Sequence, residues 1–111
     1  MPSETSTIVA VADAVWTGPF ATPGQQVGAA MEAIVFVTAL DANGQVAVSA
    51  RLQISPDGQH WVDDGTSFVL PYRPGEVTFA RARHFGAWLR VVGVLPEDAT
   101  LQVSVTIVCK A

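Results

Sequence analysis

The strongest constraint on the fold is an unbroken alternation of side chains over residues 46–54. Successive side chains leave a β-strand on opposite faces, so this pattern predicts a half-buried strand. The apolar side is formed by Val46, Val48, Ala50, Leu52 and Ile54. Pro56 and Asp57 then favour a tight turn that Gly58 closes with a positive φ. We expect Trp61, three residues later, to fold its ring back over this strand as a core anchor.

Alternating segments separated by turn residues recur along the chain. Asn43-Gly44 is among the strongest short hairpin signals, and it predicts that residues 32–40 and 45–54 pair antiparallel. Residues 101–109 alternate cleanly between apolar and polar side chains. Seven or eight short strands separated by turn signals, with no convincing helix, predict an all-β fold. The expected architecture is an antiparallel β-sandwich or jelly roll.

Residues 32–40 are apolar on both faces, and a strand of that kind is usually covered on both. In a two-sheet protein one face of such a strand packs on the other sheet, and its second face is covered by a loop or by a neighbouring subunit. We therefore expect Val35 and Val37 to lie at an interface and the chain to form a homo-oligomer.

A chain of 111 residues is long enough for one domain. Within it we distinguish residues 1–30, an N-terminal strand and Pro/Gly-rich arm, from the sandwich proper, residues 31–111. The arm is predicted to hold the domain to its neighbours, with Trp16 and Phe20 at the interface. In the alternative, residues 7–16 are simply the first strand of the chain's own sandwich.

The charge pattern excludes several classes of partner. The net charge is −4, only 14% of residues are charged, and residues 1–50 contain no Lys or Arg. A nucleic-acid partner requires a basic face, so none is expected. No window approaches the ~18 apolar residues of a membrane span, and the first residues do not resemble a signal peptide. Cys109 is alone, so no internal disulfide is expected and a reducing compartment fits better.

No motif for catalysis or cofactor binding is present, so we expect neither an enzyme nor a cofactor. His60 and His84 have no Cys or Glu at a zinc-ligand spacing. Calcium prefers carboxylate oxygens, but the candidate donors match no calcium-loop spacing. Those donors are Asp57, Asp63 and Asp64. No metal site is therefore predicted.

Aromatic and arginine side chains leave a sugar platform open as a hypothesis. Aromatic rings stack on sugar faces and Arg supplies hydrogen-bond donors, which Trp88, Arg90 and Tyr72 could provide together. The competing interpretation is that such aromatic residues mostly pack within the protein.

Two segments of the sequence resemble segments of two groups of proteins. They are residues 52–61, Leu-Gln-Ile-Ser-Pro-Asp-Gly-Gln-His-Trp, and residues 85–91, Phe-Gly-Ala-Trp-Leu-Arg-Val. The chain resembles small β-sandwich head- and tail-associated proteins of tailed bacteriophages. A weaker similarity links it to discoidin-type sandwich domains. No functional residue carries over from either group.

The first resemblance implies a non-enzymatic structural protein of a phage or phage-like particle. It would be a capsid decoration or minor virion protein that binds a protein lattice, located in the virion and assembled in the host cytoplasm. The alternatives are a carbohydrate-binding sandwich for surface attachment and a bacterial assembly protein unrelated to phage.

Overall fold

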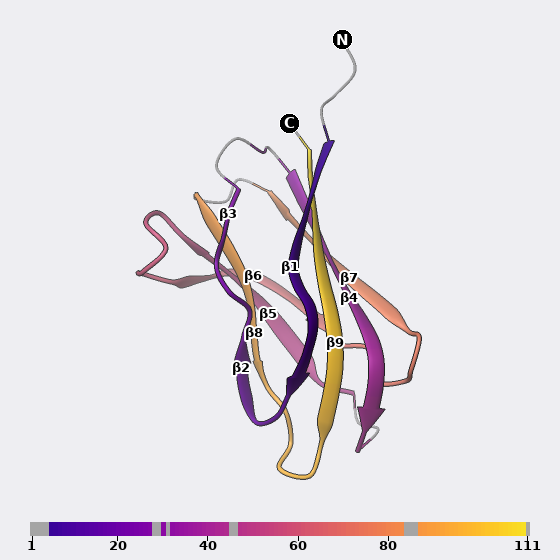
Figure 1. Ribbon diagram of the computed structural model, residues 1–111. Helices are drawn as coiled ribbons and strands as arrows, with labels where there is room; N and C mark the ends of the chain where they lie inside the picture. The colour runs from indigo at the N-terminus through magenta and orange to yellow at the C-terminus, as the bar shows by residue number, and fades with distance from the viewer. Residues whose placement is uncertain (1–4, 28–29, 31, 45–46, 84–86, 111) are drawn as a thin grey trace.

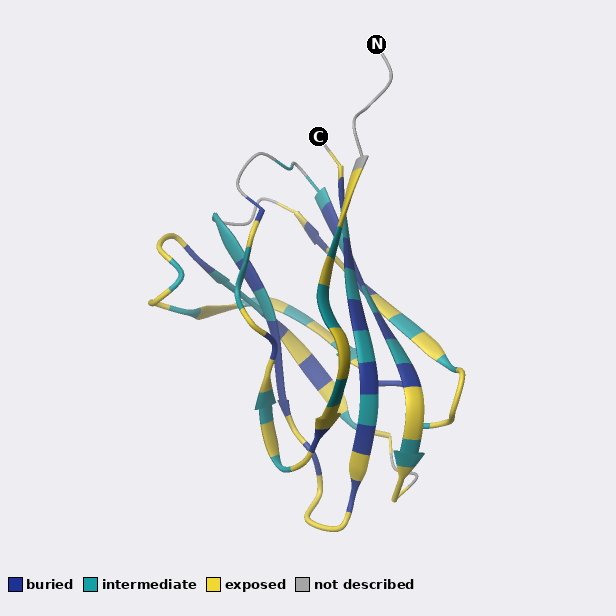
Figure 2. Ribbon diagram, in the orientation of Figure 1, coloured by how far each residue is buried: buried dark blue, intermediate teal, exposed yellow. Residues whose placement is uncertain are grey.

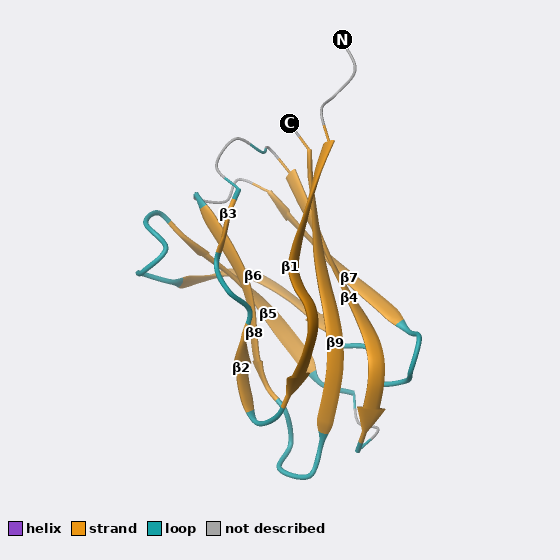
Figure 3. Cartoon of the chain, in the orientation of Figure 1, coloured by secondary structure: helices purple, strands orange, loops and turns teal. Residues whose placement is uncertain are grey.

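The computed structural model describes residues 5–27, 30, 32–44, 47–83 and 87–110. Over these ranges the chain forms strands joined by turns and loops, with no helix (Figure 3). The described part of the chain therefore holds no helix able to cross a membrane. The strands are β1 (Thr5–Trp16), β2 (Pro19–Ala21), β3 (Gln25–Gln26), β4 (Glu32–Asn43), β5 (Ser49–Ser55), β6 (Val62–Val69), β7 (Val77–Arg83), β8 (Trp88–Val94) and β9 (Thr100–Lys110).

The strands build two antiparallel sheets that pack against each other. Sheet A has the order β1-β9-β4-β7, which Figure 1 shows from left to right. Sheet B has the order β2-β8-β5-β6, and the short strand β3 also pairs with β8. This architecture confirms the predicted all-β sandwich.

The core lies between the two sheets and is built from alternate residues of each strand. Along β9, buried and partly exposed residues alternate from Leu101 to Cys109, and Figure 2 shows this banding on β4 and β9. Leu52 and Leu89 meet the core from sheet B and are fully buried. Burying one such side chain contributes about 1.5–3 kcal/mol. The inward faces predicted for residues 46–54 and 101–109 are found wherever the structure describes them.

The predicted hairpin at Asn43-Gly44 is wrong. Strand β4 continues through Asn43 and lies in sheet A, whereas β5 lies in sheet B. Both edges of β4 are already occupied, by β7 and by β9. Gly44 does adopt a positive φ of 100°, but the strands on either side of it, β4 and β5, do not pair with each other. The turn signal was local, whereas the choice of partner strand depends on distant segments.

The predicted N-terminal arm is also corrected. Strand β1 pairs with β9 of the same chain, from Thr5 opposite Lys110 to Trp16 opposite Leu101, with two irregularities between Val9 and Ala14. Strands β2 and β3 extend sheet B along β8. Residues 5–27 therefore supply edge strands to both sheets of the chain's own sandwich, as in the alternative expected for residues 7–16.

Candidate functional site

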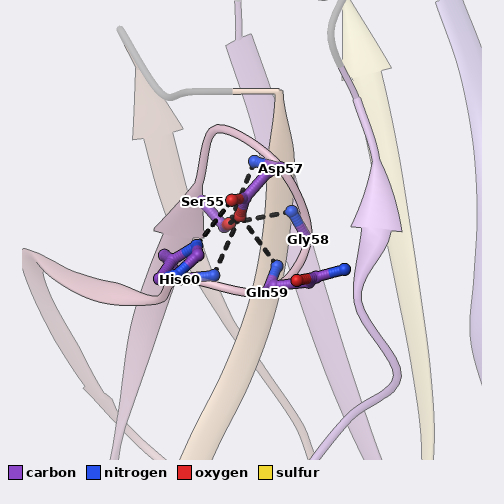
Figure 4. A network of polar contacts seen from close by, with 5 residues as sticks. All are labelled: Ser55, Asp57, Gly58, Gln59 and His60. Atoms are coloured by element: carbon purple, nitrogen blue, oxygen red, sulfur yellow. Dashed lines mark hydrogen bonds and ion pairs between the residues drawn. The ribbon is translucent and has the colours of Figure 1, made fainter.

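A hydrogen-bonded turn closes the end of β5 (Figure 4). The Ser55 hydroxyl oxygen accepts the backbone N–H groups of Asp57 at 3.2 Å and Gly58 at 2.9 Å. The same hydroxyl donates to Asp57 Oδ1 at 3.0 Å. Asp57 Oδ1 also accepts the backbone N–H groups of Gln59 and His60, both at 2.9 Å. Gly58 has a φ of 79°, as the predicted turn requires.

These hydrogen bonds favour the charged form of Asp57. The backbone N–H of His60 is the largest cause, followed by the backbone N–H of Gln59 and the side chain of His60. Together they hold the pKa of Asp57 well below its ordinary value of 3.8. A depressed pKa means that the ionised group stabilises the fold above the unfolded-state pKa, and that this stabilisation is lost as the pH falls below it.

We expect Asp57→Asn to reduce the dependence of the free energy of unfolding on pH at acidic pH. In the wild type, the free energy of unfolding should decrease as the pH falls below 3.8, because the unfolded chain binds the proton on Asp57 first. Urea melts over a series of acidic buffers measure this slope. Asp98→Asn makes the same charge change outside the turn and serves as the control. An Asp57→Asn variant with the wild-type slope would contradict the prediction.

The turn contains a serine, an aspartate and a histidine, the residue types of a serine-hydrolase triad. Their arrangement here is not that of a catalytic triad. In a catalytic triad the imidazole stands between the hydroxyl and the carboxylate and takes the hydroxyl proton. Here the Ser55 hydroxyl and His60 Nδ1 both contact the carboxylate of Asp57. Ser55 is also buried. The three side chains therefore hold the turn and do not form a nucleophile.

Two tryptophans pack closely against glycines beside this turn. A Cβ atom on Gly58 would lie 3.1 Å from the Trp88 indole. A Cβ atom on Gly24 would lie 2.8 Å from the ring of Trp61 and 3.6 Å from Trp88. Both glycines are therefore needed for the close approach of an indole ring.

We expect Gly58→Ala to destabilise the protein by about 2 kcal/mol, from the strain of a positive φ together with crowding of Trp88. Gly65 is a matched control, because its φ is 96° but a Cβ there would meet nothing within 4 Å. Gly65→Ala should therefore cost about 1 kcal/mol, from backbone strain alone. Denaturant melts of both variants test the difference, and equal losses would rule out the contribution of the Trp88 contact.

The outer face of sheet B carries a chain of polar contacts that spans three strands. Asp63 accepts hydrogen bonds from Arg51 at 3.1 Å and from Gln53 at 2.9 Å. Gln53 Oε1 accepts two from Arg90, at 2.9 and 2.7 Å. The Arg90 guanidinium carbon lies 4.3 Å from the centre of the Trp61 ring. Trp61 thus packs on the outer face of sheet B, half-buried, and its prediction as a core anchor is wrong.

An open depression of about 450 Å³ adjoins this chain of contacts. Its polar lining comes from Arg51, Gln53 and Arg90, and its apolar lining from β2 and the end of β8. Guanidinium and amide groups can bind an acidic or hydroxylated ligand, but they supply neither a nucleophile nor a general base at neutral pH.

The three predicted sugar-platform residues do not come together. Trp88 and Arg90 lie two residues apart on β8, and the ring of Trp88 is against the Ser55–His60 turn. Tyr72 follows β6 and lines a small cavity with Leu95, beyond the opposite end of β8. A ligand on Arg90 would therefore meet Trp61 and not Tyr72.

The candidate calcium donors are engaged elsewhere. Asp63 binds Arg51 and Gln53, and Asp64 accepts hydrogen bonds from Thr66 at 2.7 and 3.3 Å. Within the described ranges, no three His, Cys, Asp or Glu side chains are placed to hold a metal ion. His84 lies outside those ranges.

The outer face of sheet A carries an apolar patch. We define the patch as Val9 of β1, Ile34 and Phe36 of β4, Val77 and Phe79 of β7, and Val108 of β9. Phe36 and Phe79 are paired across the two strands, with ring centroids 6.1 Å apart. Phe79 is 49% exposed and Val77 is 51% exposed.

The predicted interface residues lie on the opposite side from this patch. Val35 and Val37 have no exposed surface and pack in the core. The signal that distinguishes the faces is that Glu32 and Thr38 share a side with Phe36, whereas the other side has no polar residue from Ala33 to Ala39. A polar side chain in the core would have to find a hydrogen-bond partner there, so the uniformly apolar side turns inward.

Trp16 and Phe20 are likewise not an exposed pair. Trp16 is 6% exposed and stacks on Phe20, with ring centroids 4.0 Å apart and planes 13° apart. Phe20 in turn packs over Gly93, where a Cβ atom would lie 2.6 Å from its ring. The predicted interface at these two residues is corrected, because they close the sandwich where β1 leads into β2.

Comparison with known proteins gives one family match and several fold matches. The model of a family described as a domain of unknown function (DUF6385) matches residues 31–111. A sequence comparison with curated proteins finds no match. The SPBc2 prophage-derived protein YomS is similar in structure, with a TM-score of 0.64 and 12% identity, covering 100% of this chain and 96% of the other.

Two further solved structures share the fold. One comes from work on Bacillus endospore appendages that form disulfide-linked pili, with a TM-score of 0.55, 12% identity, and coverage of 98% of this chain and 90% of the other. The other is the Yersinia pseudotuberculosis-derived mitogen, with a TM-score of 0.52, 9% identity, and coverage of 96% and 86%. At these identities the likeness extends to the fold alone.

Proposed function

The chain belongs to the family described as a domain of unknown function (DUF6385), and we propose that it is a non-enzymatic structural protein that assembles with other protein surfaces. The observation that carries the proposal is the apolar patch on the outer face of sheet A. The patch is centred on the paired rings of Phe36 and Phe79. Clustered, exposed apolar side chains of this kind mark interaction sites on folded proteins.

The energetics favour a protein partner for this face. Removing apolar surface from water yields roughly 25 cal/mol per Å², and the exposed halves of Phe79 and Val77 are available for that gain. Sheets pack face to face at a spacing of about 10 Å, so an apolar sheet face is suited to packing against another sheet.

The more specific role we propose is in a phage or phage-like particle, as a capsid decoration or minor virion protein. The resemblance of residues 52–61 and 85–91 to phage head- and tail-associated proteins supports it. The prophage origin of YomS and the pilus assembly of the Bacillus appendages are consistent with it, as facts about those proteins. Such a protein would be assembled in the host cytoplasm and reside in the virion.

A carbohydrate-binding module is the second candidate, favoured by the depression beside Arg51 and Arg90 on sheet B. The two functions use opposite faces of the sandwich. Arg90→Ala should abolish binding to a glycan array if sugar is the ligand, and should leave particle association intact if the patch is the assembly surface.

The test compares two exposed valines on edge strands of opposite sheets. Val77 on β7 is 51% exposed and Val69 on β6 is 47% exposed. We expect wild type and Val69→Asp to copurify with particles induced from the source strain, and Val77→Asp to be lost from them. Immunoblots of density-gradient fractions measure this. Absence of the wild-type chain from every particle fraction would refute the particle role.

A further inference from the structure

We propose that the apolar patch binds the same patch of a second copy of this chain, with the strands of the two copies antiparallel. The inference rests on the proposed function, which makes the patch an assembly surface, and it adds the partner and the orientation. Its basis is the distribution of charge at the two ends of the outer face of sheet A.

One end of this face is basic. Glu32 at the start of β4 is paired with Arg83 of β7 on one side and with Lys110 of β9 on the other. Arg83 Nη2 lies 4.0 Å from Glu32 Oε1. Arg81, two residues along β7, lies with its guanidinium carbon 5.3 Å from the centre of the Phe79 ring. Among the residues that the structure describes, three cations and one carboxylate give this end a net charge of +2.

The other end is acidic. Asp41 of β4 is paired with Gln102 of β9. Gln102 Nε2 donates to Asp13 Oδ1 of β1 at 2.8 Å. Val15, Asp41 and Gln102 line a hollow of about 100 Å³ here. Asp13 and Asp41 give this end of the face two negative charges, and Arg73 and Glu76, in the loop that hydrogen-bonds to Ala39 beside it, carry opposite charges that cancel.

The aromatic pair lies midway between the two ends. Phe36 is four residues from Glu32 and five from Asp41 along β4. At ~3.3 Å per residue the charged ends are about 30 Å apart. Four strands ~4.8 Å apart make the face on the order of 20 Å wide. Its area is therefore roughly 600 Å², comparable with the ~800 Å² that each partner contributes to a standard interface.

Two twofold arrangements would bring this face onto its own copy. With the axis parallel to the strands, each basic end would face a basic end, and each acidic end an acidic end. With the axis across the strands at the aromatic pair, the basic end of each copy faces the acidic end of the other, and the patches coincide. Opposite charges attract across an interface and like charges cost several kcal/mol, so the second arrangement is selected.

Sedimentation velocity on the purified chain tests the pairing. We expect wild type and Val69→Arg to sediment as dimers of the 11.7 kDa chain, and Val77→Arg, which would face Arg81 of the second copy, to sediment as a folded monomer. Circular dichroism confirms that each variant is folded. A wild-type chain that stays monomeric at all concentrations, or a dimer disrupted by Val69→Arg and not by Val77→Arg, would overturn the proposal.

Charge reversal tests the orientation. Arg81→Glu with Arg83→Glu leaves both ends acidic, and Asp13→Arg with Asp41→Arg leaves both ends basic. We expect each double variant to self-associate at least about tenfold more weakly than wild type, a loss of ~1.4 kcal/mol. An equimolar mixture of the two should form a heterodimer, and the fourfold variant should dimerise again. Double variants that dimerise as tightly as wild type would overturn the antiparallel arrangement.

Failure of this inference is distinguishable from failure of the proposed function. A monomer that still enters particles in a Val77-dependent manner overturns the self-pairing and leaves the structural role in place. A dimer formed through the patch but absent from all particles supports the self-pairing and removes the particle role.

Discussion

Replacing Trp16 by alanine is expected to lower the free energy of unfolding by about 3–5 kcal/mol, the usual cost of truncating a buried tryptophan. Trp16 is 6% exposed, stacks on Phe20, and ends β1 opposite Leu101 of β9. Its removal would leave a cavity at the end of the sandwich where β1, β2 and β9 meet. Urea melts with unchanged slope provide the measurement.

Trp61→Ala is the informative comparison, because Trp61 is half-buried on the outer face of sheet B. Its ring packs closely on Gly24 and contacts the Arg90 guanidinium, whose carbon lies 4.3 Å from the ring centre. A cation–π contact of this type contributes ~0.5–1 kcal/mol, and the partly buried ring adds on the order of another 1 kcal/mol. We therefore expect Trp16→Ala to cost more than Trp61→Ala. The reverse order would place Trp61 in the core, as the sequence pattern had suggested.

The fold class could be predicted from the sequence because it depends on local periodicity. The alternation in residues 46–54 and 101–109 fixes which face of each strand is buried. A shift of one residue would turn the apolar side chains from the core to the solvent. Strand partners could not be predicted, because pairing joins distant segments. Asn43-Gly44 has the residue preferences of a hairpin, yet β7 and β9 occupy both edges of the strand that precedes it.

The candidate site was only partly predictable, for a related reason. The turn at Asp57 and Gly58 is encoded within six residues, and the structure places both as the turn chemistry requires. The assembly face was assigned to the wrong side of β4, because hydrophobicity alone does not distinguish Val35 from Phe36. Pairing of Phe36 with Phe79 depends on β7, more than 40 residues away in the chain.

Deleting residues 1–16 is expected to abolish the folded state. The family match begins at residue 31, which would suggest that β4–β9 form a complete unit. The structure argues otherwise, because β1 pairs with β9 along nearly its whole length. Without β1 one edge of β9 loses its hydrogen-bond partners, and the core loses Trp16 and the four inward-facing side chains of β1, Ile8, Ala10, Val11 and Ala14.

The deletion variant should show no cooperative thermal transition by circular dichroism and should expose its amides to rapid hydrogen exchange. Val15→Thr in the full-length chain is the control, because Val15 is 63% exposed and threonine keeps the strand preference of β1. That variant should melt near the wild-type midpoint. If the deletion variant also melted cooperatively near that midpoint, β1 would be dispensable for folding, and its extensive pairing with β9 would have to serve assembly instead.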